Sequence, residues 1–151
     1  MRGAVLAILV ALSASPAAAQ DLGAAKTFVT GLYAAYARHP GPDYVGRQAK
    51  ATFSPALLDL MRKDAARTPK GDVGALDGDP ICNCQDYEIR GASVVVTAAG
   101  PSRATARVSF KNFGEAQSVA LDLAWTRAGW RVADVHAEGM PSLVKLFRDA
   151  H

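Results

Sequence analysis

After its first 19 residues the sequence has no long apolar stretch, no block of like charges and only two cysteines. A membrane-spanning helix needs about 20 consecutive apolar residues, so we expect no stable membrane insertion of the mature chain. Its lysines and arginines are dispersed, with 16 basic against 14 acidic side chains once the leader is removed, a net charge of +2. Such weak, scattered charge gives no support to nucleic-acid binding.

The sequence also lacks the motifs that indicate a particular chemistry. It has no phosphate-binding glycine loop, no nucleophile at a recognisable spacing from a base and no strong cluster of metal ligands. We therefore expect no cofactor, and the sequence leaves the identity of any ligand or metal open. These absences favour a binding or structural module over an enzyme.

The first 19 residues have the pattern of a cleavable signal peptide. Arg2 supplies a positive start, residues 4–12 form an uncharged apolar stretch, and residues 17–19 are three small alanines. We expect cleavage between Ala19 and Gln20, no lipid anchor, and a periplasmic or secreted product. Residues 20–151 are then enough for a single domain with its own core.

Two helices are predicted in the first half of the mature chain. Residues 21–38 carry apolar side chains at helical spacing, with Asp21 as N-cap, and the Pro-Gly-Pro of residues 40–42 ends the helix. A second helix begins after Ser54, with Pro55 at its first position, and ends near residue 68. Its expected buried side consists of Leu57, Leu58, Met61 and Ala65.

Beyond residue 86 the hydrophobic pattern changes to a period of two, which predicts four strands. They cover residues 87–97, with a bulge at Gly91, residues 103–111, a third segment, and residues 130–136. A short helix capped by Ser142 follows. The predicted fold is α+β: N-terminal helices packed on a curved four-stranded antiparallel meander, then a short C-terminal helix. The expected buried face of the third strand consists of Val119, Leu121, Leu123 and Trp125.

Four segments carry a resemblance to a known family: FVTGLY at 28–33, FSPALL at 53–58, LDGDPICNCQD at 76–86 and GWRVADV at 129–135. In this order they resemble a bacterial exported family known only as domain of unknown function 3828. The resemblance implies the cone-shaped, cystatin-like fold of nuclear transport factor 2, in which a curved sheet and a long helix enclose a pocket. It implies an exported location and assigns no activity.

The loop of residues 71–86 is long for so small a domain, and it contains the first candidate site. Its three carboxylates repel one another, and a hard cation such as calcium would neutralise them. The interpretation we favour is that these side chains bond to loop amides and hold the loop in one shape. The candidate residues are Asp77, Asp79, Cys82, Cys84, Gln85 and Asp86.

Three interpretations of Cys82 and Cys84 stay open. They could form a structural disulfide, although an extended pair two residues apart lies at or beyond the usual Cα separation. They could act as a redox pair, or bind a soft metal together with His136 or Met140. The sequence favours the structural pair without showing whether the two are bonded.

The last predicted strand supplies the second candidate site. A strict period of two places Trp130, Val132, Asp134 and His136 on one face, so Asp134 and His136 would form an acid–base pair on a pocket floor. A bulge after Val132 would instead put Val135 in the core and Asp134 outside, and we favour this alternative.

Aromatic residues supply the third group of candidates. Tyr36, Tyr44 and Trp130 are candidate pocket-lining residues, although such aromatics are more often core.

The function that these patterns favour is a non-catalytic ligand- or protein-binding module, whose partner is a small ligand or a periplasmic protein. One alternative is a small hydrolase, isomerase or lyase that uses Asp134 and His136 in a cone pocket, with Tyr36 or Tyr44 nearby. The other is a metal or redox protein that uses the loop of residues 77–86.

Overall fold

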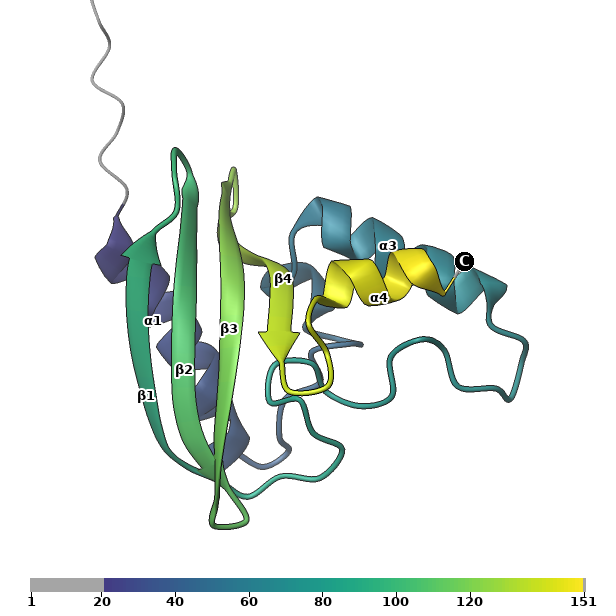
Figure 1. Ribbon diagram of the computed structural model, residues 1–151, viewed down its shortest axis with the longest axis horizontal. Coiled ribbons are helices and arrows are strands. Elements are labelled where there is room, and N and C mark those ends of the chain that lie inside the picture. The colour runs from purple at the N-terminus through teal and green to yellow at the C-terminus, as the bar shows by residue number, and fades with distance from the viewer. Residues whose placement is uncertain (1–20, 151) are drawn as a thin grey trace, which may run out of the picture.

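The computed structural model describes residues 21–150, so the predicted signal peptide lies outside the described residues. Helices come first, then strands, then one more helix, which confirms the α+β fold (Figure 1). The elements are α1 (Leu22–Ala34), the 3-10 turn η1 (Ala35–Ala37), α2 (Ala49–Thr52), α3 (Pro55–Arg67), β1 (Ile89–Ala98), β2 (Arg103–Asn112), β3 (Glu115–Thr126), β4 (Gly129–Ala137) and α4 (Leu143–Asp149). Within residues 21–150, no helix combines the length and apolarity needed to cross a membrane.

The four strands form one antiparallel sheet in the order β1-β2-β3-β4. The predicted bulge in β1 is confirmed, because its pairing with β2 shifts between Arg90 and Ser93. Gly91 lies in this bulge with φ +63°, a left-handed conformation that glycine adopts without steric cost. Strand β2 alternates as predicted and buries Ala104, Ala106, Val108 and Phe110.

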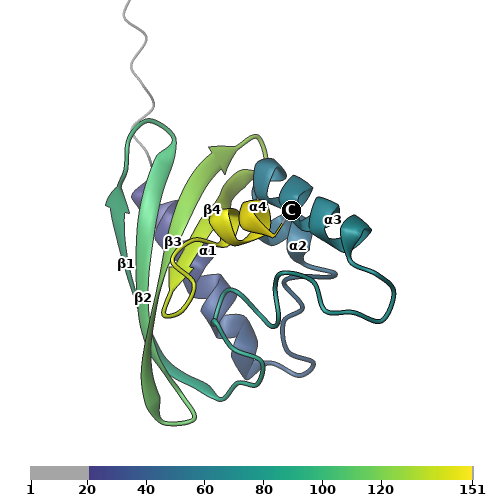
Figure 2. The same ribbon diagram turned by 45° about the vertical axis from the view of Figure 1, so that its right-hand side comes forward.

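Helix α1 packs on one face of the sheet, which we call the inner face. The predicted N-cap is confirmed, since the Asp21 carboxylate accepts a hydrogen bond from the Ala24 amide at 2.8 Å. Figures 1 and 2 show α1 running behind the curved strands in both views. Its buried residues are Ala25, Val29, Leu32 and Tyr33.

Helix α3 begins where the sequence predicts, at Pro55 after the N-cap Ser54. It contacts α4 and the edge strand β4, and it lies beside the sheet rather than over its face (Figure 1). Of its predicted buried side, Leu57 is buried and Leu58 and Met61 are partly buried, which confirms the prediction for these three. The prediction is wrong for Ala65, which is exposed, whereas Asp64 is buried and accepts a hydrogen bond from the amide of Ala75 at 3.1 Å.

The outer edge of β4 is paired at Val132 with the segment that leads into α3. Phe53 pairs with Val132 as an isolated parallel bridge, and the Ser54 amide donates to the Val132 carbonyl at 2.8 Å. At this position the edge strand is paired, which leaves less of its edge open to another chain. Near the β3–β4 hairpin, Trp125 was predicted to be buried on the third strand, and this prediction is wrong. Its side chain is 52% exposed and packs edge-on against Trp130.

Candidate functional site

A bulge in β4 decides which of its side chains share a face. Leu123 pairs with Val132, but the preceding Asp122 pairs with Asp134, so Ala133 is an extra residue on β4. Every residue after the bulge is thereby turned to the opposite face. The favoured prediction of a bulge after Val132 is therefore confirmed, and the alternative of a strict period of two through residues 130–136 is wrong.

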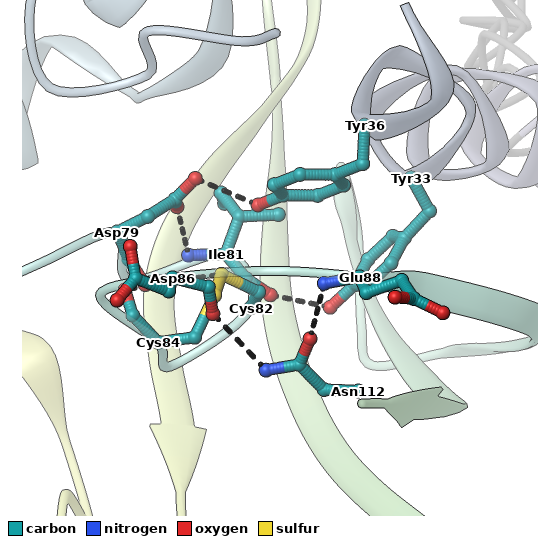
Figure 3. Close-up of a disulfide and its surroundings, with 9 residues drawn as sticks. All are labelled: Tyr33, Tyr36, Asp79, Ile81, Cys82, Cys84, Asp86, Glu88 and Asn112. Carbon is teal, nitrogen blue, oxygen red and sulfur yellow. Dashed lines mark hydrogen bonds between the residues drawn. A yellow bond between two sulfur atoms is a disulfide. The ribbon is translucent and has the colours of Figure 1, made fainter. Parts of the chain in front are cut away.

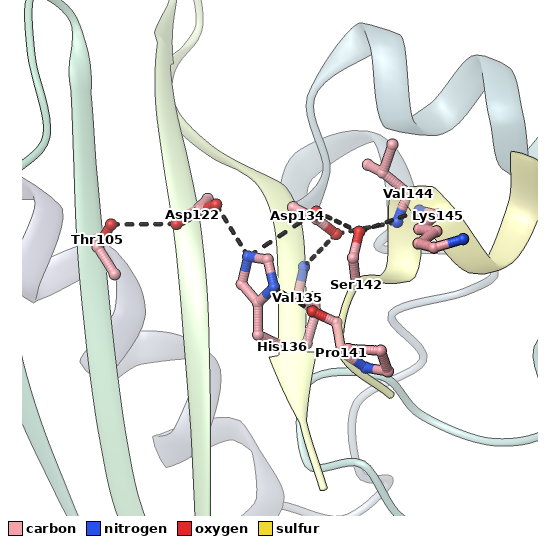
Figure 4. Close-up of polar contacts among 9 residues, drawn as sticks. All are labelled: Thr105, Asp122, Asp134, Val135, His136, Pro141, Ser142, Val144 and Lys145. Carbon is pink, nitrogen blue, oxygen red and sulfur yellow. Dashed lines mark hydrogen bonds and ion pairs between the residues drawn. The ribbon is translucent and has the colours of Figure 1, made fainter. Parts of the chain in front are cut away.

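The bulge separates the apolar residues of β4 from its acid and imidazole. Trp130, Val132 and Val135 are buried on the inner face. Asp134 and His136 lie on the outer face, away from α1 (Figure 4). Their side chains are 17% and 35% exposed.

His136 lies between backbone and carboxylate acceptors (Figure 4). Its Nδ1 is 2.6 Å from the carbonyl oxygen of Pro141, and its Nε2 is 2.9 Å from Oδ2 of Asp122. The same Nε2 lies 3.8 Å from Oδ2 of Asp134. Because a carbonyl oxygen can only accept, Nδ1 carries a proton and donates it to Pro141.

These surroundings shift the protonation of the imidazole. Burial by itself lowers the pKa of His136, since it disfavours the charged form. The carbonyl of Pro141 and the carboxylates of Asp122 and Asp134 stabilise the imidazolium and outweigh burial, so that the pKa is raised above its ordinary value.

Asp134 anchors the start of α4. Its Oδ1 accepts hydrogen bonds from the amides of Val135 at 2.8 Å and Val144 at 2.9 Å, and its Oδ2 accepts one from Ser142 Oγ at 2.6 Å. Ser142 in turn caps α4, as predicted, by accepting from the amide of Lys145 at 3.0 Å. Both carboxylate oxygens of Asp134 are thus engaged in holding β4 and α4 together.

The predicted acid–base pair lies on the partly exposed outer face of the sheet, on the side opposite α1. Asp134 and His136 line none of four surface hollows that lie within residues 21–150. Tyr36 and Tyr44, the predicted helpers, are buried in the core on the inner side of the sheet. Trp130 is likewise 4% exposed, and its Nε1 donates to the carbonyl of Asp21 at 3.2 Å.

Cys82 and Cys84 form a disulfide with a Cα–Cα distance of 5.2 Å (Figure 3). Asn83 between them has φ +51°, which lets the chain fold back within two residues. The Asp79 amide donates to the Cys84 carbonyl at 2.8 Å, and the Cys84 amide donates back at 3.1 Å. Cys82 is 2% exposed. Bonded to each other and partly buried, the two sulfurs are not free thiolates for a metal, and the arrangement favours the structural interpretation.

Asp79 and Ile81 connect the disulfide loop to η1 and α1. Its Oδ2 accepts from the hydroxyl of Tyr36 at 2.7 Å, and its Oδ1 accepts from the amide of Ile81 at 2.8 Å (Figure 3). Tyr33 donates to the carbonyl of Ile81, and Tyr44 donates to the carbonyl of Leu32. Burial raises the pKa of Asp79 despite the two donors, and it also raises that of Tyr36.

The remaining loop candidates do not meet Asp79. Asp77 is exposed and accepts from Gln85 Nε2 at 2.8 Å, and the Asp86 carbonyl accepts from Asn112 at 3.2 Å. Within residues 21–150, one group of acidic and histidine side chains converges closely enough to hold a metal ion, and it is Asp122, Asp134 and His136. The loop carboxylates form no such group in that range.

A groove lined by cations lies where α2, the first turns of α3 and the β3–β4 hairpin meet. We call it the basic groove; its volume is about 560 Å³. Arg47, Lys50, Arg62 and Arg131 line it, and no acidic residue does. The other lining residues are Gly46, Ala49, Phe53, Pro55, Leu58, Thr126 and Ala128.

The sequence analysis did not single out Asp122 or the four cations of the basic groove. Asp122 alternates with the buried Leu121 and Leu123, so its place on the outer face could have been read from the pattern. Its pairing with Asp134 could not, because that depends on the bulge. Arg131 carried no signal, since the Lys50 carbonyl that it meets lies 81 residues away in the sequence.

No protein-family model and no curated protein matches the chain, so the resemblance to the exported family stays a prediction. Among solved structures the chain is similar to a chain of the type VI effector–immunity complex Tae3–Tai3 from Ralstonia pickettii. The sequence identity is 19%, the TM-score is 0.49, and the match covers 78% of this chain and 94% of that one.

It is also similar to a phospholipid-binding protein from Ralstonia solanacearum, solved with a phospholipid. Here the sequence identity is 16% and the TM-score 0.35, over 85% of this chain and 73% of that one. At these identities and TM-scores, neither similarity carries a function across to this chain.

Proposed function

We propose that the mature chain is an exported, non-catalytic binding module, and that its ligand is a small anion with an apolar part, bound in the basic groove. The observation that carries this proposal is the composition of the groove, in which four cationic side chains and no acidic one surround an apolar base. The exported location rests on the predicted signal peptide.

Two of the four cations are available to a ligand. Among residues 21–150 no ion pair is described for Lys50 or Arg131. Arg131 is held in place by its Nη1, which donates to the Trp130 carbonyl at 2.7 Å, and by its Nε, 3.4 Å from the Lys50 carbonyl. A guanidinium has five N–H donors, so three stay available for an anion.

The other two cations are only loosely engaged. Arg47 lies 3.4 Å from Asp43 and Arg62 lies 3.9 Å from Asp59, with both arginine side chains about three-quarters exposed. Exposed ion pairs contribute at most about 1 kcal/mol, and a ligand anion can exchange for the aspartates at little cost. The groove therefore keeps a positive potential.

The apolar base and the size of the groove indicate that the ligand has an apolar body of small-molecule size. Phe53, Pro55 and Leu58 lie among the cations. The volume of about 560 Å³ falls within the range of roughly 300–1,000 Å³ that is usual for small-molecule sites. A carboxylate, sulfonate or phosphate attached to a hydrocarbon or aromatic body matches this lining.

The test uses 8-anilinonaphthalene-1-sulfonate, an anionic aromatic probe, titrated into the protein of residues 20–151 while its fluorescence is followed. We expect saturable binding that weakens at higher salt, since screening reduces the attraction between the sulfonate and the cations. In the double variant Lys50→Gln with Arg131→Gln the affinity should fall by about tenfold, which corresponds to about 1.4 kcal/mol.

The matched control is Arg103→Gln with Arg107→Gln, which removes the same charge from β2 at exposed positions. The control should bind within twofold of the wild type. Equal weakening in both double variants would show a response to net charge alone and would contradict the proposal, as would the absence of saturable binding. Circular dichroism of each variant confirms that it is folded.

A further inference from the structure

The strand register brings two carboxylates face to face on the outer surface of the sheet. Asp122 of β3 and Asp134 of β4 are direct cross-strand partners. Like charges at such positions destabilise a sheet. Within residues 21–150 the ion pairs described for these two aspartates all lead to His136. One imidazole therefore faces two carboxylates, which leaves an excess of negative charge whether or not the ring is doubly protonated.

The three side chains also converge at one point. Their potential ligand atoms, one from each residue, all lie within 4.8 Å of one another. Ligand atoms around a tetrahedral zinc ion, at about 2.0–2.2 Å from the metal, are roughly 3.3 Å apart. The distances of 2.9 and 3.8 Å from His136 Nε2 to the two carboxylates bracket this value.

Each of the three side chains is held by a partner behind it. The carbonyl of Pro141 fixes the proton on Nδ1 of His136, so that Nε2 faces the carboxylates. Thr105 Oγ1 donates to Asp122 Oδ1 at 3.1 Å, and Ser142 Oγ donates to Asp134 (Figure 4). Such outer partners orient metal ligands and fix the histidine tautomer.

We propose that Asp122, Asp134 and His136 form a binding site for a first-row divalent transition metal ion, with zinc as the probe. One imidazole and two carboxylates suit this class of ion better than calcium or magnesium, which prefer oxygen ligands alone. When the ion binds, it takes the place of the proton on Nε2, and that proton passes to solvent. The three residues are partly exposed, so water can complete the coordination.

The inference does not depend on the basic groove, which shares none of these residues. It also differs from the earlier prediction of a metal in the loop of residues 77–86. There the carboxylates lie apart and the cysteines are bonded to each other.

The experiment is calorimetric titration of zinc chloride into the protein of residues 20–151, freed of metal with a chelator and then dialysed. The variants are Asp122→Asn and His136→Gln, which preserve size and hydrogen bonding. We expect one zinc ion per chain in the wild type and an affinity lowered by at least about tenfold in each variant. Cobalt titration gives a second readout, because ligand-field absorption bands appear when this ion enters a protein site.

The matched control is His39→Gln, which removes an exposed histidine outside the cluster and should bind zinc within twofold of the wild type. Asp77→Asn serves the same purpose for a carboxylate of the loop. The proposal is overturned if the wild type binds no zinc at about 1 mM, the scale of the weakest protein calcium sites. It is equally overturned if Asp122→Asn and His136→Gln bind as well as the wild type.

Discussion

Two polar networks lie on opposite sides of the sheet, and they differ in burial and in charge balance. Around Asp79, on the inner side, a mostly buried carboxylate accepts from the Tyr36 hydroxyl and the Ile81 amide. Around His136, on the outer side, two carboxylates share one imidazole and are partly open to solvent. A buried network with matched donors and acceptors fixes a structure, whereas a partly open network with surplus charge leaves room for a ligand.

The largest expected effect comes from the buried network. Asp79→Ala should lower the free energy of unfolding by about 2–4 kcal/mol, because the Tyr36 hydroxyl and the Ile81 amide would be left buried without an acceptor. Urea denaturation followed by circular dichroism measures the difference.

The control for this prediction is Asp77→Ala, in an exposed residue of the same loop whose partner is the exposed Gln85. We expect a change within about 0.5 kcal/mol. If Asp77→Ala cost as much as Asp79→Ala, the buried bonds of Asp79 would not be what holds the loop.

On the outer side, replacing Asp134 should cost more free energy of unfolding than replacing Asp122. Asp134→Ala should cost about 1–3 kcal/mol in metal-free protein, because the Val135 amide on β4 and two donors at the start of α4 lose their acceptor. Asp122→Ala should cost at most about 1 kcal/mol, since its side chain is 44% exposed. Equal losses in thermal denaturation would mean that both aspartates act only as ion-pair partners of His136.

The smallest effect is the pH dependence contributed by His136 in metal-free protein. Its pKa is raised in the folded state, so its stabilisation is fully present below the unfolded value of about 6.5 and is lost as pH rises through the folded value. The stability difference between wild type and His136→Gln should therefore shrink from about pH 6 to pH 9. A difference that grows with pH would show that the neutral imidazole is the stabilised form.

Much of the fold is predictable because caps and strand alternation depend on residues that are close together in the sequence. The Asp21 and Ser54 caps bond to amides three residues away, and they set the starts of α1 and α3 as the sequence indicates. The alternation of β2 is clean because the strand is central and one of its faces is buried. Trp125 fits the alternation of β3 and Ala65 fits the helical spacing of α3, yet both are exposed. Their burial depends on how far the neighbouring helices and strands extend.

The candidate sites depend on contacts between distant parts of the chain. Asp79 meets Tyr36 from 43 residues away, and Arg131 meets Lys50 from 81 residues away. No local pattern encodes such pairs, because loop closure and packing bring them together. The loop of residues 77–86 was recognisable as unusual, yet its carboxylates proved to bond in different directions.

By itself the sequence determined the α+β order of elements, the caps, the turns and the alternation of the strands, since each follows from chemistry within a few residues. The sequence favoured a bulge after Val132 but left strict alternation open, and only the tertiary structure decided that Ala133 bulges out of β4. That choice buries Val135 opposite Leu121 and turns Asp134 and His136 outward to Asp122. The physical reason is that burial of an apolar side chain and exposure of a charged one are both favourable, and one extra residue in the strand satisfies both.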